Sequence, residues 1–562
     1  MRDTGKYQQG VLALVPCEEK TMTTAKWRGP TECLDDGNQS RKSLSTSASS
    51  ETRSTSGSSA SVCQRTRLDG SGSSSVAMSM SGCAMDAPTT ATALRDVKED
   101  KVQFQQVESK GVSRLPHGRK QMNTASGRQA RELVRPTFID LFAGCGGLSL
   151  GLMQAGWHGL FAIEQNHDAF KTLHHNLIEQ NTRRPFPNGF DWPAWLEKNP
   201  VKIQRFISAN RSRLNELRGT VNLVVGGPPC QGFSFAGRRT GDDPRNKLFR
   251  YHLRIVRLLQ PELALIENVH GINATFTSGR NYASHISEML GRCGYSVQQH
   301  IFKASDYGVP QIRTRFFILG IRNDIVGSGA VPDLATIMHL VRPVFLDKHG
   351  LPANSPVTVS EALSDLITEG KMLVDCGDKE SPPGFKEIEY KGPESNYQRL
   401  MHGNMNGQSI NSLRLVNHRA GTVIRFRRII STCRKGVNIS NHDRERLAIR
   451  KMSITPLAPD KPSHTLTTLP DDLLHYSEPR VHTVREHARL QSFPDWFEFR
   501  GKFTTGGDRR VHECPRYTQV GNAVPPLLAE AIGESLLEIR RRIGLDSSAK
   551  REQRLVKLRG DT

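Results

Sequence analysis

Short apolar runs, each closed by a glycine- or proline-rich turn, recur between residues 135 and 322 and alternate with helical patterns. One run, Val-Asn-Leu-Val-Val-Gly-Gly at 221–227, is stopped by Pro228 and Pro229, as is typical of a buried strand ending at a sheet edge. The pattern at 246–260 is that of an amphipathic crossover helix. Strands that alternate with such helices favour an α/β fold, and we predict a doubly wound, mostly parallel sheet with helices on both faces.

Residues capable of chemistry follow or end several of these runs. Cys230 comes directly after the two prolines, where ligands of open α/β sheets bind. Glu267 lies in the apolar run 263–269, and a buried carboxylate is costly unless it is paired or protonated. Arg313 and Arg315 open a further run and point to one face by the two-residue period of a strand. A packing cysteine, a structural carboxylate and a surface arginine ladder are the alternatives, but together these residues indicate a clamp for a polar, anionic substrate.

A glycine-rich turn follows the first apolar run, in the segment 137–152. Glycines let the backbone approach a ligand closely, and the helix that begins there offers free amide groups. About twenty residues later the run 159–166 ends in Glu164, which is placed to accept hydrogen bonds from two ribose hydroxyls. The glycines lack the spacing of the dinucleotide fingerprint, which argues against a nicotinamide or flavin cofactor.

The composition is basic, with 77 Lys and Arg against 56 Asp and Glu, a net charge of +21 and a sequence pI of about 9.7. This balance favours a polyanionic partner through counterion release. No run reaches the roughly 18 apolar residues of a membrane span, and the N-terminus lacks a secretory apolar core. The ten cysteines show no paired CxxC spacing, so we expect reduced cytosolic thiols and no metal site.

Six segments, in this order, resemble the motif series of the DNA cytosine carbon-5 methyltransferases. They are Phe-Ala-Gly-Cys-Gly-Gly, Pro-Pro-Cys-Gln-Gly-Phe-Ser, Glu-Asn-Val, Gln-Ile-Arg-Thr-Arg-Phe, the segment at 483–495 and Gln-Val-Gly-Asn-Ala-Val-Pro-Pro at 519–526. The resemblance covers residues 135 to about 545. It implies a Rossmann-like methyltransferase sheet, S-adenosyl-L-methionine as cofactor and double-stranded DNA as partner. It also implies a monomeric enzyme that is located in the bacterial cytoplasm and associated with the nucleoid.

The resemblance gives the catalytic residues their roles. The Cys230 thiolate would add to carbon 6 of cytosine, so that carbon 5 can attack the sulfonium methyl group. Glu267 would hold and protonate ring nitrogen 3, which requires a raised carboxyl pKa. Arg315 would grip the carbonyl oxygen at carbon 2, and Arg313 would support Cys230 or its loop. The target base must first be flipped out of the duplex.

The resemblance also implies binding residues. Those for the cofactor are Phe142, Ala143, Gly144, Cys145, Gly146, Gly147, Leu148, Glu164, Leu248, Asn522 and Ala523. Those for DNA are Gln231, Ser234, Arg238, Arg239, Arg425, Arg427 and Thr465, with Arg414, Arg419 and Arg428 as further candidates. We expect Cys145 to be a packing residue rather than a second nucleophile.

The chain divides into five segments by composition and by the resemblance. These are a disordered Ser/Thr-rich tail (1–134), the first part of the catalytic domain (135–322), a second, smaller target-recognition domain (323–482), the returning part of the catalytic domain (483–545) and a charged tail (546–562). The first tail cannot offset its ordering entropy by burial, and we expect it to be dispensable, with Met122 as an alternative start.

Two other functions are compatible with this scaffold. A branch of the family methylates transfer RNA, although the wording of the Gln231–Ser234 loop and the long insert favour DNA. A DNA-binding protein without catalysis would be expected to have lost one of the catalytic residues, and all four are present. We predict the modification half of a restriction-modification system, with a cognate endonuclease acting separately, or a solitary methyltransferase.

Overall fold

The computed structural model describes residues 135–179, 189–229 and 248–545, apart from 275, 278–279, 327–328, 404, 406, 408, 506–508 and 510–512. All of these belong to the compact unit Met122–Thr562. The predictions for both tails, and those for Cys230, Gln231, Ser234, Arg238 and Arg239, therefore lie outside the described residues.

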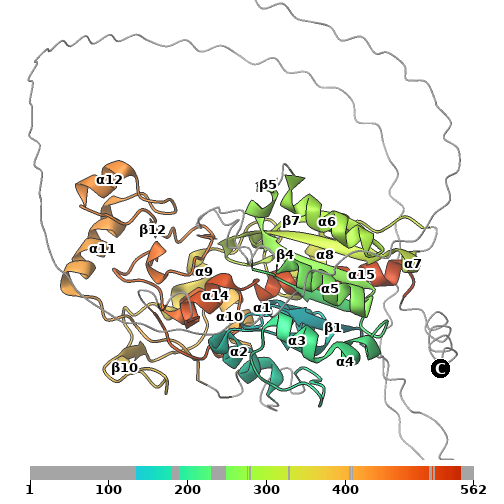
Figure 1. The fold of residues 1–562 in the computed structure, drawn as a ribbon. Helices are drawn as coiled ribbons and strands as arrows, with labels where there is room; N and C mark the ends of the chain where they lie inside the picture. Colours follow the sequence, from blue (N-terminus) through green and yellow to red (C-terminus); the bar gives the residue numbers. More distant parts are fainter. Residues whose placement is uncertain are drawn as a thin grey trace, which may run out of the picture. The chain divides into compact units, whose positions relative to one another are not determined.

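A six-stranded mixed sheet forms the centre of the predicted catalytic domain (Figure 1). Its strands, in spatial order, are β2 (His158–Ile163), β1 (Thr137–Leu141), β3 (Leu223–Gly226), β4 (Leu263–Val269), β9 (Thr314–Arg322) and β7 (Tyr295–Lys303). The first four run parallel, and β9 is antiparallel to both of its neighbours. The prediction of a mostly parallel Rossmann-like sheet is confirmed.

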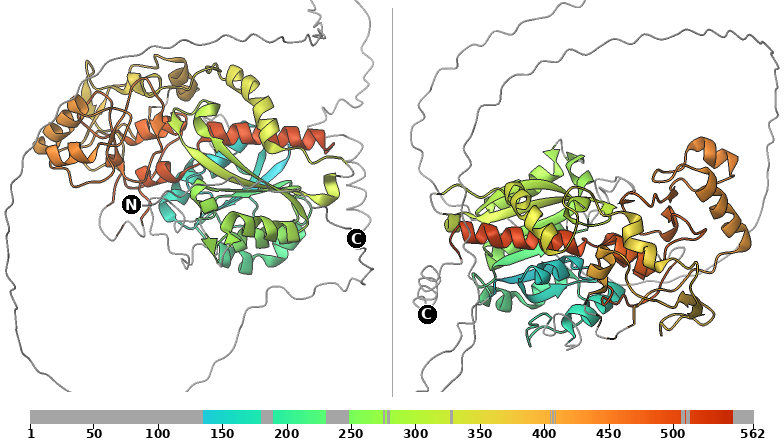
Figure 2. Two further views of the ribbon diagram at one scale, coloured as in Figure 1. Left: turned by 90° about the horizontal axis from the view of Figure 1, so that it is seen from above. Right: turned by 180° about the vertical axis from the view of Figure 1, so that it is seen from behind.

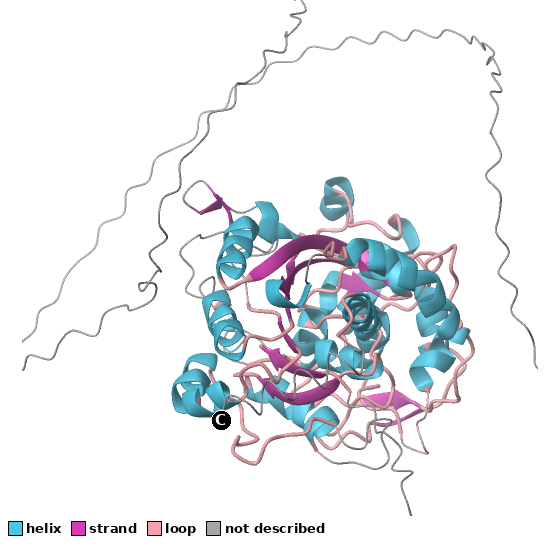
Figure 3. Cartoon of the chain, turned by 90° about the vertical axis from the view of Figure 1, so that its right-hand side faces the viewer, coloured by secondary structure: helices cyan, strands magenta, loops and turns pink. Residues whose placement is uncertain are grey.

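Helices cover both faces of the sheet, because successive side chains of each strand point to opposite sides. Phe138 belongs to the core cluster that also contains side chains of α1, α8 and α15, whereas Ile139 belongs to the cluster under α3, α4, α5 and α6. Figure 2 and Figure 3 show the two helical layers. These helices are α1 (Gly147–Gln154), α3 (Ile203–Ala209), α4 (Arg211–Glu216), α5 (Phe249–Leu259), α6 (Tyr282–Arg292), α8 (Leu334–Lys348) and α15 (Pro526–Arg542).

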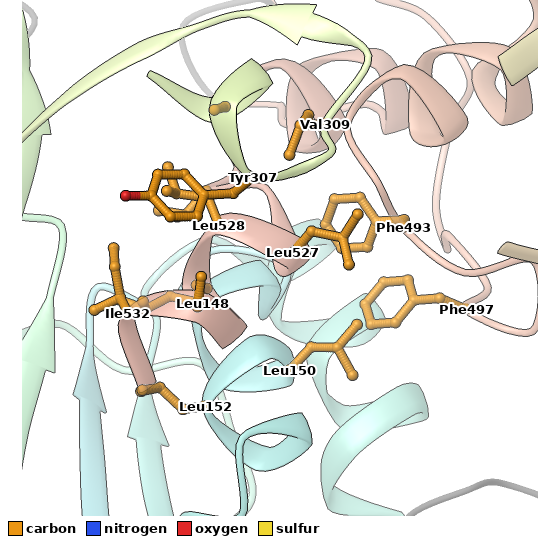
Figure 4. Close-up of a cluster of buried hydrophobic side chains, with 14 of the residues drawn as sticks. Leu148, Leu150, Leu152, Tyr307, Val309, Phe493, Phe497, Leu527, Leu528 and Ile532 are labelled. Atoms are coloured by element: carbon orange, nitrogen blue, oxygen red, sulfur yellow. The ribbon is translucent and has the colours of Figure 1, made fainter. Parts of the chain in front are cut away.

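The C-terminal helix α15 packs directly on α1. A Cβ on Gly151 would lie 2.4 Å from the Cβ of Ala529, so only glycine permits this approach. The Trp157 Nε1–H donates to the Gly533 carbonyl at 2.9 Å, although the two residues are 376 positions apart. Figure 4 shows leucines of α1 and α15 in one cluster with Phe493. Helix α15 and helix α1, although far apart in the sequence, thus contribute to one hydrophobic core.

The stretch between β9 and the C-terminal segment is less regular. Its helices are α7 (Asn323–Val326), α8, α9 (Val359–Leu363), α10 (Asn396–His402), α11 (Ala420–Thr432) and α12 (Asn441–Arg446), and its short strands include β10 (Leu373–Asp375), β11 (Lys386–Ile388), β12 (Thr455–Pro456), β13 (Ser463–His464) and β14 (Leu473–Leu474). The buried side chains of α8 belong to the catalytic core. A separate small core surrounds Phe426 and Ile429 of α11. We call residues 413–481, which lie within the predicted target-recognition domain (323–482), the recognition lobe.

Buried arginines connect these parts. In α13 (Val484–Leu490), the fully buried Arg489 pairs with Asp365 at 3.0 Å and with Asp495 at 2.7 Å. Arg516, the first residue of α14 (Arg516–Asn522), pairs with Glu380 at 2.8 Å. Buried charges are tolerated only when paired, so these contacts fix how the segments meet. No helix within the described ranges is long and apolar enough to span a membrane.

Candidate active site

A carboxylate and a guanidinium meet at the carboxyl end of β4. Arg315 Nε lies 2.9 Å from Glu267 Oε1, and the two side chains are only 10% and 13% exposed. The antiparallel register places Arg315 opposite Val269, so its side chain reaches diagonally to Glu267. Burial raises the pKa of Glu267, while the positive charges of Arg315 and Arg313 oppose the rise. The Glu267 carboxyl is therefore more easily protonated than an exposed one.

The end of β3 touches the same carboxyl group. A Cβ on Gly227 would lie 2.8 Å from Glu267 Oε2, so a side chain here would collide with the acid. The Asn268 Nδ2 donates to the Pro228 carbonyl at 3.5 Å. The next residues of the chain are Pro229 and Cys230, so the segment carrying the predicted nucleophile departs from a point in contact with Glu267.

Arg313 has partners different from those of Arg315. Its guanidinium donates to the carbonyls of Leu466 at 3.1 Å, Gly521 at 2.7 Å and Ala523 at 3.1 Å, and the residue is 1% exposed. The prediction of one continuous strand is wrong, because β8 (Gln311–Ile312) ends before Arg313 and β9 begins after it. Arg313 thus joins the end of the recognition lobe to the turn after α14.

Thr465 lies beside the same short strand. Strands β8 and β13 pair in parallel, Gln311 with Ser463 and Ile312 with His464. The exposed Thr465 donates its Oγ1 hydrogen to the Ile312 carbonyl at 2.8 Å. The structure therefore brings this predicted DNA contact close to the arginine pair, and β13 returns the lobe to the catalytic domain.

The glycine-rich turn and Glu164 meet as expected of a ligand site. Glu164 accepts hydrogen bonds from the backbone N–H of Gly144 at 2.9 Å and of Asn166 at 2.6 Å. Gly144 has φ +57° and open space where a Cβ would stand, so this part of the turn has room for a ligand. Phe142 adopts φ +62°, a conformation uncommon for a bulky residue. Such backbone strain persists where the surrounding structure fixes it.

The C-terminal segment borders this turn from the other side. A Cβ on Gly147 would lie 2.4 Å from the Val524 carbonyl oxygen and 3.4 Å from the Ala523 Cβ. Asn522 is exposed beside them. The predicted cofactor residues from both ends of the chain are therefore neighbours. Of the others, Leu148 is buried in the first turn of α1, and Leu248 is half-buried at the start of α5.

Cys145 is a buried residue whose Sγ donates to the Gln519 carbonyl at 3.6 Å. Burial raises the pKa of its thiol to about 12, so it remains protonated at neutral pH. It has the environment of a packing residue.

Sequence reasoning missed Asp140, a fully buried carboxylate in β1. Its Oδ2 accepts from the Ser149 hydroxyl at 2.5 Å, and its Oδ1 has no hydrogen-bond partner. Burial, opposed by the Ser149 hydrogen bond and reinforced by Glu164 and Glu267, raises the Asp140 pKa to about 7. The signal was available, since a carboxylate within an apolar run is the feature that singled out Glu267.

The predicted DNA-contacting arginines of the lobe fall into two groups. Arg425, Arg427 and Arg428 are exposed on α11, and Arg419 is exposed at its N-terminal end. None of the four forms an ion pair with another described residue. The candidate Arg414 is wrong as a DNA contact, because its guanidinium lies between the rings of Phe385 and Phe503, at 4.1 and 3.7 Å. Among the described residues, no group of three His, Cys, Asp or Glu side chains could hold a metal ion.

The Rossmann-like sheet carries the acid–arginine pair at the end of a strand, where enzymes of this fold class bind their ligands. Residues 136–538 match the family described as C-5 cytosine-specific DNA methylase, and the chain belongs to that family. It is a DNA cytosine-5 methyltransferase.

Similar proteins are named as DNA-modifying or type II methyltransferases. The chain is 31% identical to the type II methyltransferase M.DdeI of Desulfomicrobium norvegicum, over 71% of this chain and 88% of that protein. It is 30% identical to the type II methyltransferase M1.HphI of Haemophilus parahaemolyticus, over 72% and 87%. A crystal structure assigned as a prophage-encoded DNA modification methyltransferase (E. coli) is 26% identical, has a TM-score of 0.51 and covers 72% of this chain and 99% of that chain.

Proposed function

We propose that this enzyme methylates carbon 5 of a flipped-out cytosine in a specific duplex DNA sequence, using S-adenosyl-L-methionine and a covalent bond between Cys230 and carbon 6. The observation that carries the proposal is the buried Glu267–Arg315 pair. Gly227, three residues before Cys230, lies next to the Glu267 carboxylate. A neutral heterocycle with one protonatable ring nitrogen and one carbonyl oxygen suits such a pair of groups.

Each residue then has one chemical task. The Cys230 thiolate donates its electron pair to carbon 6, and Glu267 supplies a proton to ring nitrogen 3 as the ring accepts that charge. Arg315 donates to the carbonyl oxygen at carbon 2 and orients Glu267 through their ion pair. Carbon 5, once it carries the methyl group, loses its proton to water or hydroxide. The Cys230–carbon 6 bond then breaks with its electron pair returning to sulfur, and ring nitrogen 3 returns its proton to Glu267, which restores the aromatic ring. The raised pKa of Glu267 supports its role as the acid.

The open space beside Gly144 and the nearby Glu164 carboxylate suit the proposed cofactor. S-adenosyl-L-methionine, when bound, supplies an electrophilic methyl group at its sulfonium sulfur. Gly144 and Asn166 hold the Glu164 carboxylate in place, and its remaining acceptor capacity suits the ribose hydroxyls. The first turn of α1, from Gly147, has backbone N–H groups without intrahelical partners, which suit a carboxylate.

The names of the relatives support a proposal for the biological setting. M.DdeI and M1.HphI are named as type II methyltransferases, and we propose that this enzyme likewise protects DNA as the modification half of such a system, or acts alone. It would act as a monomer in the bacterial cytoplasm. Its basic composition supports a nucleic-acid substrate.

A mechanism-based trap tests the proposal. A duplex with 5-fluorocytosine at the target should form an adduct that survives denaturant, because fluorine cannot leave carbon 5 as a proton does. Cys230→Ser should lose both the adduct and turnover, and Cys293→Ser, which alters a partly buried thiol at the C-terminal end of α6, should keep both. Normal methylation by Cys230→Ser would overturn the mechanism.

The substrate is tested separately. Transfer of a labelled methyl group should go to duplex DNA, and bisulfite sequencing of host DNA should locate it. Labelling of transfer RNA in place of DNA would assign the enzyme to the transfer-RNA branch. Binding of DNA without labelling of either would make it a silent DNA-binding protein.

A further inference from the structure

We propose that an exposed apolar ridge, formed by Ile312, Val437 and Met452 with His464 and Thr465, contacts the bases of the duplex next to the target cytosine. The inference rests on the proposed function, because it names the surface that would receive the DNA. It assigns part of sequence recognition to apolar contact, in addition to the arginines of α11.

The ridge begins at the catalytic strand. Ile312 is 40% exposed, although its neighbours Gln311 and Arg313 are fully buried. Each extended residue advances about 3.3 Å, so Ile312 lies within roughly 10 Å of Arg315 along the chain. Ile312 is therefore an exposed apolar residue close to the Glu267–Arg315 pair that would receive the flipped base.

A strand pair and a hydrogen bond continue the ridge into the recognition lobe. His464 pairs with Ile312 across β8 and β13, and its Nε2 lies 2.6 Å from the Gly436 carbonyl oxygen. The next residue, Val437, is 37% exposed. The His464 contact thus attaches the 436–438 segment to the strand pair that starts at the catalytic arginines.

The third apolar residue lies on the adjoining segment. Asn438 Nδ2 donates to the Met452 carbonyl at 3.1 Å, and the Ile454 N–H donates back to Asn438 Oδ1 at 2.9 Å. Met452 is 68% exposed. Single exposed apolar residues are common, but three from separate segments, joined by hydrogen bonds beside an active site, indicate an interaction surface.

The charge around the ridge selects DNA as the occupant. Between residues 413 and 452 the only acidic side chains are Asp443 and Glu445, whereas lysines and arginines recur throughout. Asp443 is itself paired with Arg446 at 2.7 Å. An apolar strip in a basic setting suits base edges and thymine methyl groups flanked by phosphates.

The distinguishing property is the salt dependence of binding. Phosphate contacts release counterions, so removing one lowers the slope of log Kd against log salt by about 1, whereas removing an apolar base contact leaves the slope unchanged. The full chain carrying Val437→Ala and Met452→Ala should bind the methylatable duplex about tenfold more weakly at every salt concentration, with unchanged slope. Arg425→Ala should lower the slope.

The controls use the same chemistry elsewhere. Leu340 and Val344 are 51% and 71% exposed on α8, so Leu340→Ala with Val344→Ala should leave DNA affinity unchanged. Hydrogen exchange of the unmodified enzyme should show protection of the segments 436–438 and 452–454 when duplex is added. A change in affinity below about twofold, an equal loss in the α8 variant, or absence of this protection would overturn the proposal while wild-type methyl transfer stays intact. A concentration-dependent mass abolished by the ridge variant would instead make the ridge a contact between copies of the enzyme.

Discussion

The two arginines of the Gln-Ile-Arg-Thr-Arg motif should differ in what their loss removes. Arg313 donates to three carbonyl groups and is fully buried, whereas Arg315 pairs with the Glu267 carboxylate. Lysine keeps the charge of either residue but concentrates its donors at one point, so it cannot span carbonyls in two segments. We therefore expect Arg313→Lys to affect stability and cofactor binding, and Arg315→Lys to affect the chemical step.

The magnitude follows from the hydrogen bonds. If Arg313→Lys loses two of its three bonds, at about 1.5 kcal/mol each for a charged donor, the free energy of unfolding falls by about 3 kcal/mol. A domain of this size shifts by about 1–2 °C per kcal/mol when the entropy of unfolding is scaled with length, so Tm should fall by about 3–6 °C. Because the Gly521–Ala523 turn borders Gly147, the Kd for S-adenosyl-L-methionine should rise as well.

Scanning calorimetry and isothermal titration of the cofactor measure both effects, and single-turnover methylation measures the chemistry. Arg315→Lys should keep Tm within about 2 °C and lower the methylation rate by roughly 10²-fold, as expected when a group acting in the transition state is displaced. The opposite pattern, a stable Arg313→Lys with normal cofactor affinity and no chemistry, would refute the reasoning and make Arg313 a catalytic residue.

Three further outcomes are expected. Glu267→Gln should fold but methylate at least 10²-fold more slowly, since an amide cannot give up a proton, and recovery of activity at low pH would contradict this. Gly147→Ala should lose about 1–3 kcal/mol in denaturant titration, because its Cβ would overlap the Val524 carbonyl, whereas Gly291→Ala on α6, which meets open space, should not. Burial holds the pKa of Asp140 at about 7, against about 3.9 when unfolded, so the folded state binds this proton more tightly and its stability should fall as pH rises from about 4 to 7. Asp140→Asn should reduce that loss of stability by up to about 4 kcal/mol. An unchanged pH profile of unfolding would show that Asp140 does not cause the decline.

Much of the active site could be predicted because each of its residues is recognisable from the few residues around it in the sequence. Glu267 is conspicuous as a carboxylate in an apolar run, and the structure gives it a buried partner and a raised pKa. Glu164 could be placed at the end of a strand opposite a glycine turn, and it bonds to that turn. The role of Cys230 stays a prediction, since it lies outside the described residues.

Predictions from residue type alone were misleading for arginines whose contact partners come from distant segments of the chain. Arg414 reads as one more cation of a basic stretch, yet two phenylalanine rings from other segments enclose it. Arg313 reads as half of a substrate clamp, yet its partners lie 153 to 210 positions later in the chain. A guanidinium looks the same in sequence whether it faces a phosphate or a carbonyl.

The sequence by itself determined which runs form strands and helices and which faces they bury, because side-chain periodicity encodes burial over a few residues. It therefore determined the α/β class, and it predicted ligand sites at the strand ends. Only the tertiary structure decided that β9 runs antiparallel between β4 and β7, that α15 returns to pack on α1, and that the segments carrying Ile312, Val437 and Met452 are joined by hydrogen bonds. These features depend on contacts between segments far apart in the chain, and such contacts form only when the whole core is packed.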